Sequence, residues 1–214
     1  MGLIYPGVPN WIADFAASSN QIYAAIETGT HVGNSTRQLS SKFQLVETIE
    51  SSAELFEKAQ KLSVERKNIR FHLGESSQTL SRILQNHTEP IFFWLDAHYS
   101  GGNTSGLMAP CPLLQELGVL ADWNLVQDSI ICVDDARLFG APHDLAPQME
   151  GWPSTFEVLM QIDSMNLSSF IMDDVIVAIP EKLRKSYMNA YSNQFISGQP
   201  PKVKTKNLLK KLLR

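Results

Sequence analysis

The most informative stretch of this sequence is Ile26-Glu27-Thr28-Gly29-Thr30-His31-Val32-Gly33-Asn34-Ser35-Thr36. An apolar run before it predicts a buried strand over residues 22–27, and a helical pattern starts near Ser35. In open α/β sheets, ligands bind over such strand-to-helix turns, at the carboxyl ends of the strands. Gly29 and Gly33 allow close approach to the backbone, and the following helix offers free N–H groups. Glu27 adds negative charge where a nucleotide-like or cationic ligand would lie.

Composition indicates one ordinary globular domain. The chain has 214 residues, of which 43% are hydrophobic and 19% charged, enough for a substantial core. We expect a single domain over residues 1–200, with a helical lead-in over 1–20 and a basic amphipathic tail over 201–214. The net charge of −4 gives no global nucleic-acid signature, so no nucleic-acid partner is expected.

The two cysteines, Cys111 and Cys132, do not make a disulfide framework, and a reducing compartment is the simpler interpretation. No stretch is long and apolar enough to span a membrane, and the first 20 residues lack the pattern of a signal peptide. A cytoplasmic location is therefore the default expectation.

Hydrophobic periodicity predicts strands and helices in alternation. We expect strands at 22–27, 44–49, 69–73, 91–95 and 129–133, and then a hairpin within 170–179 that turns at Asp173-Asp174. Helices are expected at 9–19, 35–41, 53–63, around 80–84, at 111–123 and at 155–165, with a long loop at 137–153. Such alternation predicts an α/β fold, with a doubly wound, mostly parallel seven-stranded sheet that carries an antiparallel C-terminal hairpin strand.

Acidic residues follow this pattern at the ends of the expected parallel strands. The acids at or just past these ends are Glu27, Glu50, Glu75, Asp96 and the pair Asp134-Asp135. Because the carboxyl ends of parallel strands meet at one edge of a sheet, the sequence predicts a ring of carboxylates there.

With these acids, the run from Glu27 to Thr36 resembles motif I of class I S-adenosylmethionine-dependent methyltransferases. Glu50 matches the acid that binds the ribose hydroxyls in that family, and Gly74-Glu75-Ser76 is similar to its Gly-Asp-Ser, which holds the adenine. Carboxylates also favour a ligand that carries sulfonium and ammonium charges. The cofactor-binding residues that the resemblance implies are Glu27, Gly29, Thr30, Gly33, Ser35, Glu50, Gly74, Glu75, Ser76 and Asp96.

Within that family, Asp96 and Asp134-Asp135 resemble the metal site of the catechol and macrocin O-methyltransferase-like branch. The resemblance implies that Asp96, Asp134 and Asp135 hold Mg²⁺ or a similar divalent cation, which would lower the pKa of the acceptor hydroxyl. The catechol enzymes have a lysine where this chain has Tyr99. His98 is then the first candidate for the general base, with Asp96 and His143 as alternatives.

The sequence thus favours an S-adenosylmethionine-dependent O-methyltransferase, assisted by a divalent metal, that acts on a small hydroxylated acceptor such as a sugar or a natural-product scaffold. One alternative is a nicotinamide-dependent oxidoreductase, although the turn reads Gly-x-x-x-Gly rather than Gly-x-Gly-x-x-Gly. Another is a non-catalytic methyltransferase-like interaction module. The segment 202–214, with six basic residues and no acidic one, would pack on the body, on a partner or on an anionic surface. The sequence does not decide whether the chain forms a homo-oligomer.

Overall fold

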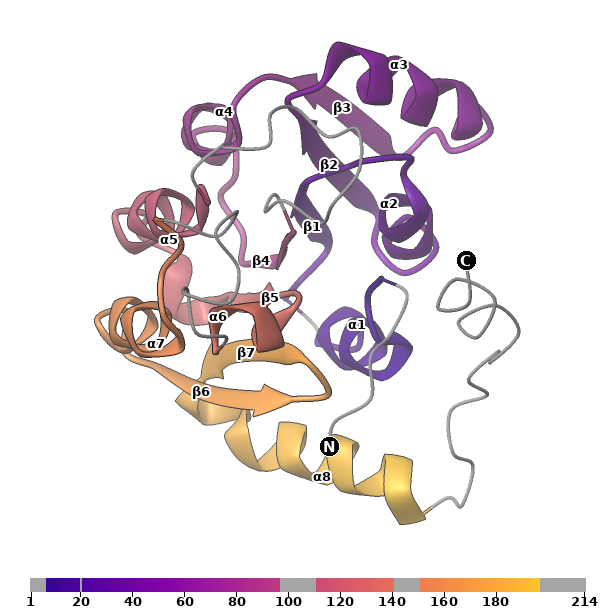
Figure 1. Cartoon of the computed structure of the whole chain (residues 1–214). Coiled ribbons are helices and arrows are strands. Elements are labelled where there is room, and N and C mark those ends of the chain that lie inside the picture. The colour runs from indigo at the N-terminus through magenta and orange to yellow at the C-terminus, as the bar shows by residue number, and fades with distance from the viewer. Residues whose placement is uncertain (1–6, 20, 97–110, 141–150, 197–214) are drawn as a thin grey trace, which may run out of the picture.

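The computed structural model describes residues 7–19, 21–96, 111–140 and 151–196, and these form a seven-stranded sheet in the order β3-β2-β1-β4-β5-β7-β6 (Figure 1). The first five strands pair in parallel, whereas β7 lies antiparallel between β5 and β6. The predicted fold class, including the antiparallel hairpin at one edge, is confirmed.

The strands are β1 (Ala24–Thr28), β2 (Leu45–Glu50), β3 (Ile69–Leu73), β4 (Ile91–Leu95), β5 (Ile130–Val133), β6 (Leu167–Met172) and β7 (Val175–Pro180). The α-helices are α1 (Asn10–Ala17), α2 (Asn34–Leu39), α3 (Ala53–Leu62), α4 (Ser76–Leu84), α5 (Leu113–Ala121), α6 (Ala136–Phe139), α7 (Thr155–Asp163) and α8 (Arg184–Ile196). Two short 3-10 helices, η1 (Val126–Asp128) and η4 (Glu181–Leu183), complete the described elements.

Strand β4 shows why the central strands are continuously apolar. All its residues are buried, because Phe93 packs into the core under α4, α5 and α7 while Phe92 and Trp94 pack into the core under α1, α2 and α8. Figure 1 shows these two groups of helices on opposite sides of the sheet. A strand covered on both faces has no polar side, as is typical of parallel sheets.

The structure differs from the sequence-based expectation in two segments. Residues 136–139 form the short helix α6, so the expected loop over 137–153 begins inside a helix. Helix α8 was not predicted; it packs through the buried Tyr187, whose ring lies 5.3 Å from that of Trp11 and 5.6 Å from that of Phe170. Aromatic contacts between distant segments hold this helix, and such contacts leave little periodic signal.

No helix among the described residues is long and apolar enough to cross a membrane. The tail over 201–214 lies outside the described residues, so its predicted contacts stay predictions.

Candidate functional site

The strand ends are tied together at one edge of the sheet. The amide of Gly29 donates to the carbonyl of Ile49, and the amide of Gly74 donates to the carbonyl of Glu50. On the other side of β1, the amide of Asp96 donates to the carbonyl of Thr28, and that of Asp134 donates to Leu95. This register brings the first residues after β1, β3, β4 and β5 to a common edge, as predicted for the acidic residues.

The turn after β1 requires unusual backbone conformations. Gly29 and Gly33 have φ values of 81° and 74°, and His31 between them has a φ of 50°. Left-handed residues are costly except for glycine, so the two glycines make this compact turn possible. Helix α2 starts immediately after Gly33, and Thr30 is buried with its hydroxyl 2.6 Å from that of Thr48. At Gly29 and Gly33 the turn therefore presents backbone without side chains, while His31 between them is exposed.

Glu27 lies fully buried beneath this turn. The hydroxyls of Thr36 and Thr48 donate to its Oε2 at 2.5 and 2.7 Å. Its Oε1 has no partner among the described residues. Burial raises the pKa of Glu27, and these hydrogen bonds oppose the rise. A buried acceptor without a partner is costly, so this oxygen is suited to a donor group on a ligand.

Glu50 is the last residue of β2 and links two segments of the edge. Its Oε2 accepts from the amide of His31 at 2.7 Å, and its Oε1 accepts from the amide of Ser52 at 2.9 Å. Each carboxylate oxygen has a second lone pair, so Glu50 retains the capacity to accept from a ligand hydroxyl.

The third strand end carries Gly74, Glu75 and Ser76. A Cβ on Gly74 would meet the hydroxyl of Thr79 at 2.8 Å, so the chain is close-packed here. Glu75 occupies the N-cap position of α4 without a capping hydrogen bond from its side chain, and it is exposed. The helix-capping role, the alternative to ligand contact, is therefore absent for the Glu75 side chain.

Asp96 and Asp134 share one electrostatic environment. Burial raises the pKa of Asp96 well above its ordinary value, and the charges of Asp134, Asp135 and Glu27 raise it further. The pKa of Asp134 rises to about 7, first through burial and then through the charge of Asp135. The structure thus gathers the carboxylates that follow β1, β4 and β5 into one acidic region.

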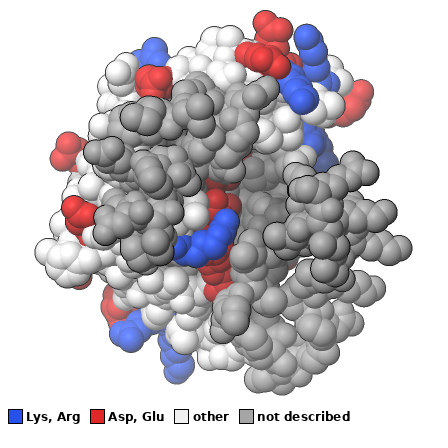
Figure 2. All heavy atoms as spheres, in the orientation of Figure 1, with Lys and Arg blue, Asp and Glu red and all other residues white. Residues whose placement is uncertain are grey.

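Asp135 is paired with a cation. It adopts a left-handed conformation with a φ of 53°, and its Oδ1 lies 2.6 Å from Nη1 of Arg137. The same Nη1 contacts the carboxylate of Asp174, in the turn between β6 and β7. Figure 2 shows basic and acidic side chains together at the centre of this face.

The three predicted metal ligands do not form a donor set as they stand. Within the described ranges, no group of three or more His, Cys, Asp or Glu side chains is placed to hold a metal ion. Asp96 and Asp134 have the chemistry for a divalent cation, but the Asp135 oxygen is bonded to Arg137. The arrangement therefore does not fit the predicted Mg²⁺ site.

Glu116 is a site residue that the sequence analysis missed. It lies on α5 and is 1% exposed, and its Oε1 has no partner in the described part of the chain. Burial raises its pKa to about 7. The available signal was an acid at helical spacing among Leu113, Leu117 and Leu120.

Three predicted features fall outside the described residues: His98 as the base, Tyr99 at the position of the lysine, and the alternative base His143. Trp152, within the segment predicted as a long loop, is 4% exposed, and its ring lies 5.7 Å from that of Phe139.

No family model and no curated protein matches this chain. Solved structures do resemble it. An O-methyltransferase from Bacillus cereus in complex with SAH aligns with a TM-score of 0.56 and 14% identity, over 79% of this chain and 80% of that one. The O-methyltransferase TomG from Streptomyces achromogenes, in complex with SAM, aligns with a TM-score of 0.55 and 15% identity, over 80% and 78%. The SAH-bound methyltransferase PaMTH1 from Podospora anserina aligns with a TM-score of 0.54 and 12% identity, over 80% of this chain and 76% of that one. At these identities the likeness establishes the fold, which is that of the class I methyltransferases.

Proposed function

We propose that this chain is an S-adenosylmethionine-dependent methyltransferase that acts on a hydroxyl group of a small acceptor. The observation that carries the proposal is Glu27, buried under a left-handed glycine turn with one carboxylate oxygen unpartnered among the described residues. The fold supports it, because similar structures include O-methyltransferases in complex with SAH and SAM.

The residues of this edge fit the cofactor by the chemistry of their donors and acceptors. Glu27 would accept from the ammonium group of the methionine end, over the turn formed by Gly29, Thr30 and Gly33. Glu50 would accept from the ribose hydroxyls, as its free lone pairs allow. The exposed carboxylate of Glu75 and the neighbouring Ser76 would hold the adenine. When bound, S-adenosylmethionine supplies an electrophilic methyl group on a sulfonium centre.

The protein's own contribution would be binding, orientation and proton removal. Several carboxylates around Asp96 stabilise positive charge at this edge before reaction, when the sulfonium is present. A hydroxyl acceptor has to lose its proton to the protein. We assign this role to His98, which lies two residues after Asp96, and Asp96 with its raised pKa is the second candidate. Alignment of the two reactants would supply much of the rate.

Divalent metal assistance, which the sequence resemblance implied, enters no step of this proposal. Its third ligand, Asp135, is bonded to Arg137. The acceptor class, a sugar or natural-product hydroxyl, rests on the sequence resemblance and on the similar O-methyltransferase structures.

A transfer assay tests the proposed function. The purified chain would be incubated with methyl-labelled S-adenosylmethionine and a panel of sugars and phenolic natural products, with Glu50→Ala as the matched variant. We expect label on an acceptor oxygen, and loss of most transfer in the variant. If no acceptor is labelled and NAD is reduced in the presence of hydroxylated substrates, the oxidoreductase alternative replaces the proposal. If the chain binds the cofactor but transfers no methyl group to any acceptor, the interaction-module alternative is favoured.

A further inference from the structure

The end of β5 is built around a short helix that a distant turn caps. Helix α6 starts at Ala136, whose amide donates to the carbonyl of Asp174 at 2.8 Å. The next amide, that of Arg137, donates to Oδ1 of Asp174 at 2.9 Å. Asp174 lies in the turn between β6 and β7, so two backbone hydrogen bonds fix the start of α6 to a neighbouring strand pair.

This cap also sets the position of the Arg137 side chain. With its backbone held by Asp174, Arg137 reaches back over the strand end, and its Nη1 contacts carboxylate oxygens of both Asp174 and Asp135. The carboxylates are largely covered, with side chains 17% exposed for Asp135 and 9% for Asp174, while that of Arg137 is 45% exposed. A guanidinium that bridges two carboxylates is a strong, charge-assisted contact, because it does not deprotonate at physiological pH.

The electrostatic surroundings explain why a cation belongs here. Asp134 and Asp135 are neighbours in the chain, the amide of Asp135 donates to Oδ1 of Asp134 at 2.8 Å, and Nη1 of Arg137 joins Asp135 to Asp174. Carboxylates packed this closely repel one another unless they are protonated or matched by positive charge. A divalent ion and a guanidinium are alternative ways to supply that charge at the same Asp135 oxygen.

We propose that Arg137 is the resident cation of this strand end, and that its bond to Asp135 prevents the carboxylates of Asp96, Asp134 and Asp135 from recruiting a divalent metal. This inference rests on the proposed function for the reaction itself. It adds that methyl transfer at this site does not depend on a divalent ion. The acidic residues that resemble a metal site are then neutralised by a side chain of the same chain.

Titration with Mn²⁺, followed by the loss of its free electron paramagnetic resonance signal, tests the proposal without an activity assay. The variant Arg137→Met keeps a flexible, unbranched side chain but removes the guanidinium and its charge. We expect weak Mn²⁺ binding by the wild-type chain and binding at least about tenfold tighter by Arg137→Met, the size of effect typical when a metal site gains or loses a supporting group. The double variant Arg137→Met/Asp135→Asn should lose this gain, and Arg137→Lys should resemble the wild type.

The variant Asp174→Asn removes the charge of one of the two carboxylates that Arg137 contacts, and it keeps both Arg137 and Asp135. We expect it to bind Mn²⁺ no more tightly than the wild type. The proposal is overturned if the wild type binds Mn²⁺ as tightly as Arg137→Met does. It is overturned equally if Asp135→Asn alone weakens Mn²⁺ binding by the wild-type chain.

Thermal unfolding of each variant shows whether it is folded. If Arg137→Met does not fold, Arg137→Gln takes its place: tighter Mn²⁺ binding than by the wild type supports the proposal, and binding no tighter than by the wild type overturns it. Titration of the wild type with SAH distinguishes failure of the proposed function from failure of the inference about Arg137. Absence of SAH binding would contradict the proposed function, whereas the Mn²⁺ results bear only on Arg137.

Discussion

The hydroxyl of Thr36 donates to Oε2 of Glu27, while Oε1 of the same carboxylate has no partner among the described residues. Thr36 lies in the first turn of α2 and Glu27 lies in β1, so this contact spans the glycine turn between them. One half of the carboxylate thus holds the turn in place, and the other half is left for a ligand.

Replacement of Glu27 by Gln should weaken SAH binding. The amide keeps the size of the side chain but removes its charge and replaces one acceptor oxygen by a donor. We expect the dissociation constant to rise about tenfold or more, as for loss of a buried hydrogen bond to a charged group. Calorimetric titration measures it, with Glu54→Gln on the exposed side of α3 as the control. An unchanged SAH affinity in a folded Glu27→Gln variant would remove Glu27 from the cofactor site.

Replacement of Gly33 by Ala should destabilise the chain through its backbone. Gly33 has a φ of 74°, and an added Cβ would meet the end of the Arg37 side chain at 3.3 Å and would make ordinary contacts with Ala59 and Ser63 at 3.5 Å. The cost is therefore mainly the left-handed conformation, about 1–2 kcal/mol. Gly118, inside α5 with open space around it, is the matched control, and its replacement by Ala should be neutral or stabilising. Urea unfolding would contradict the account if both variants changed stability alike.

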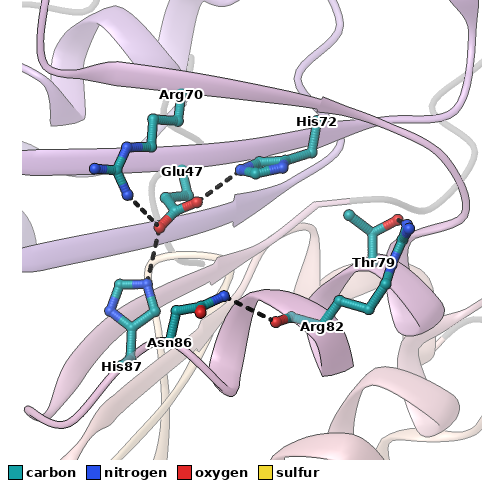
Figure 3. A network of polar contacts seen from close by, with 7 residues as sticks. All are labelled: Glu47, Arg70, His72, Thr79, Arg82, Asn86 and His87. Atoms are coloured by element: carbon teal, nitrogen blue, oxygen red, sulfur yellow. Dashed lines mark hydrogen bonds and ion pairs between the residues drawn. The ribbon is translucent and has the colours of Figure 1, made fainter.

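Glu47 forms a polar network on the sheet, away from the strand ends. Its carboxylate contacts His72 at 2.6 Å and His87 at 2.9 Å, and Arg70 lies 3.6 Å away (Figure 3). Burial raises the pKa of Glu47, but the hydrogen bonds and charges of the two histidines outweigh this effect and bring the pKa down to about 2.

This network predicts that stability falls in acid. The pKa of Glu47 is lower in the folded chain, at about 2, than its ordinary value of 4.5, so its contribution is present above pH 4.5 and is lost as the pH falls toward 2. We expect Glu47→Gln to be less stable than the wild type at pH 7 by up to about 3 kcal/mol, with the difference shrinking in acid. The exposed Glu65→Gln is the control, and a difference independent of pH would contradict the assignment.

Glu116 should show the opposite dependence on pH. Burial raises its pKa from 4.5 to about 7, so the folded chain favours the protonated form, and stability is lost as the pH rises through this window. Glu116→Gln cannot ionise at this position. We therefore expect its free energy of unfolding to rise relative to that of the wild type between pH 5 and pH 8, by up to roughly 3 kcal/mol. Unfolding at a series of pH values measures this gain, and parallel curves for the two proteins would argue against a buried, ionising Glu116.

The sequence predicted the features that depend on local periodicity. The bounds of β3 and β4 were predicted to the residue. Strand β4 is a continuous apolar run that is buried on both faces, whereas β3, at the edge of the sheet, alternates apolar and polar residues. The meeting of Glu27, Asp96 and Asp134 also followed from chain order, since parallel strands end at a common edge.

The features that were missed depend on contacts between distant segments. Helix α8 rests on Tyr187 against Trp11 in α1, and Arg137 is positioned by Asp174, which lies 37 residues further along. Glu116 reads in sequence as one acid in an amphipathic helix, and only packing shows that it faces the interior. The sequence predicted that Asp96, Asp134 and Asp135 lie at the same edge of the sheet, but it did not show that Arg137 pairs with Asp135.

Calorimetric titration of the purified chain with SAH, and separately with NAD, tests the central claim most directly. We expect SAH to bind at one site and NAD not to bind. SAH binding should be weaker in Glu50→Ala, because the carboxylate of Glu50 is assigned to the ribose hydroxyls. Binding of NAD together with no binding of SAH would contradict it, because the strand edge would then hold a dinucleotide.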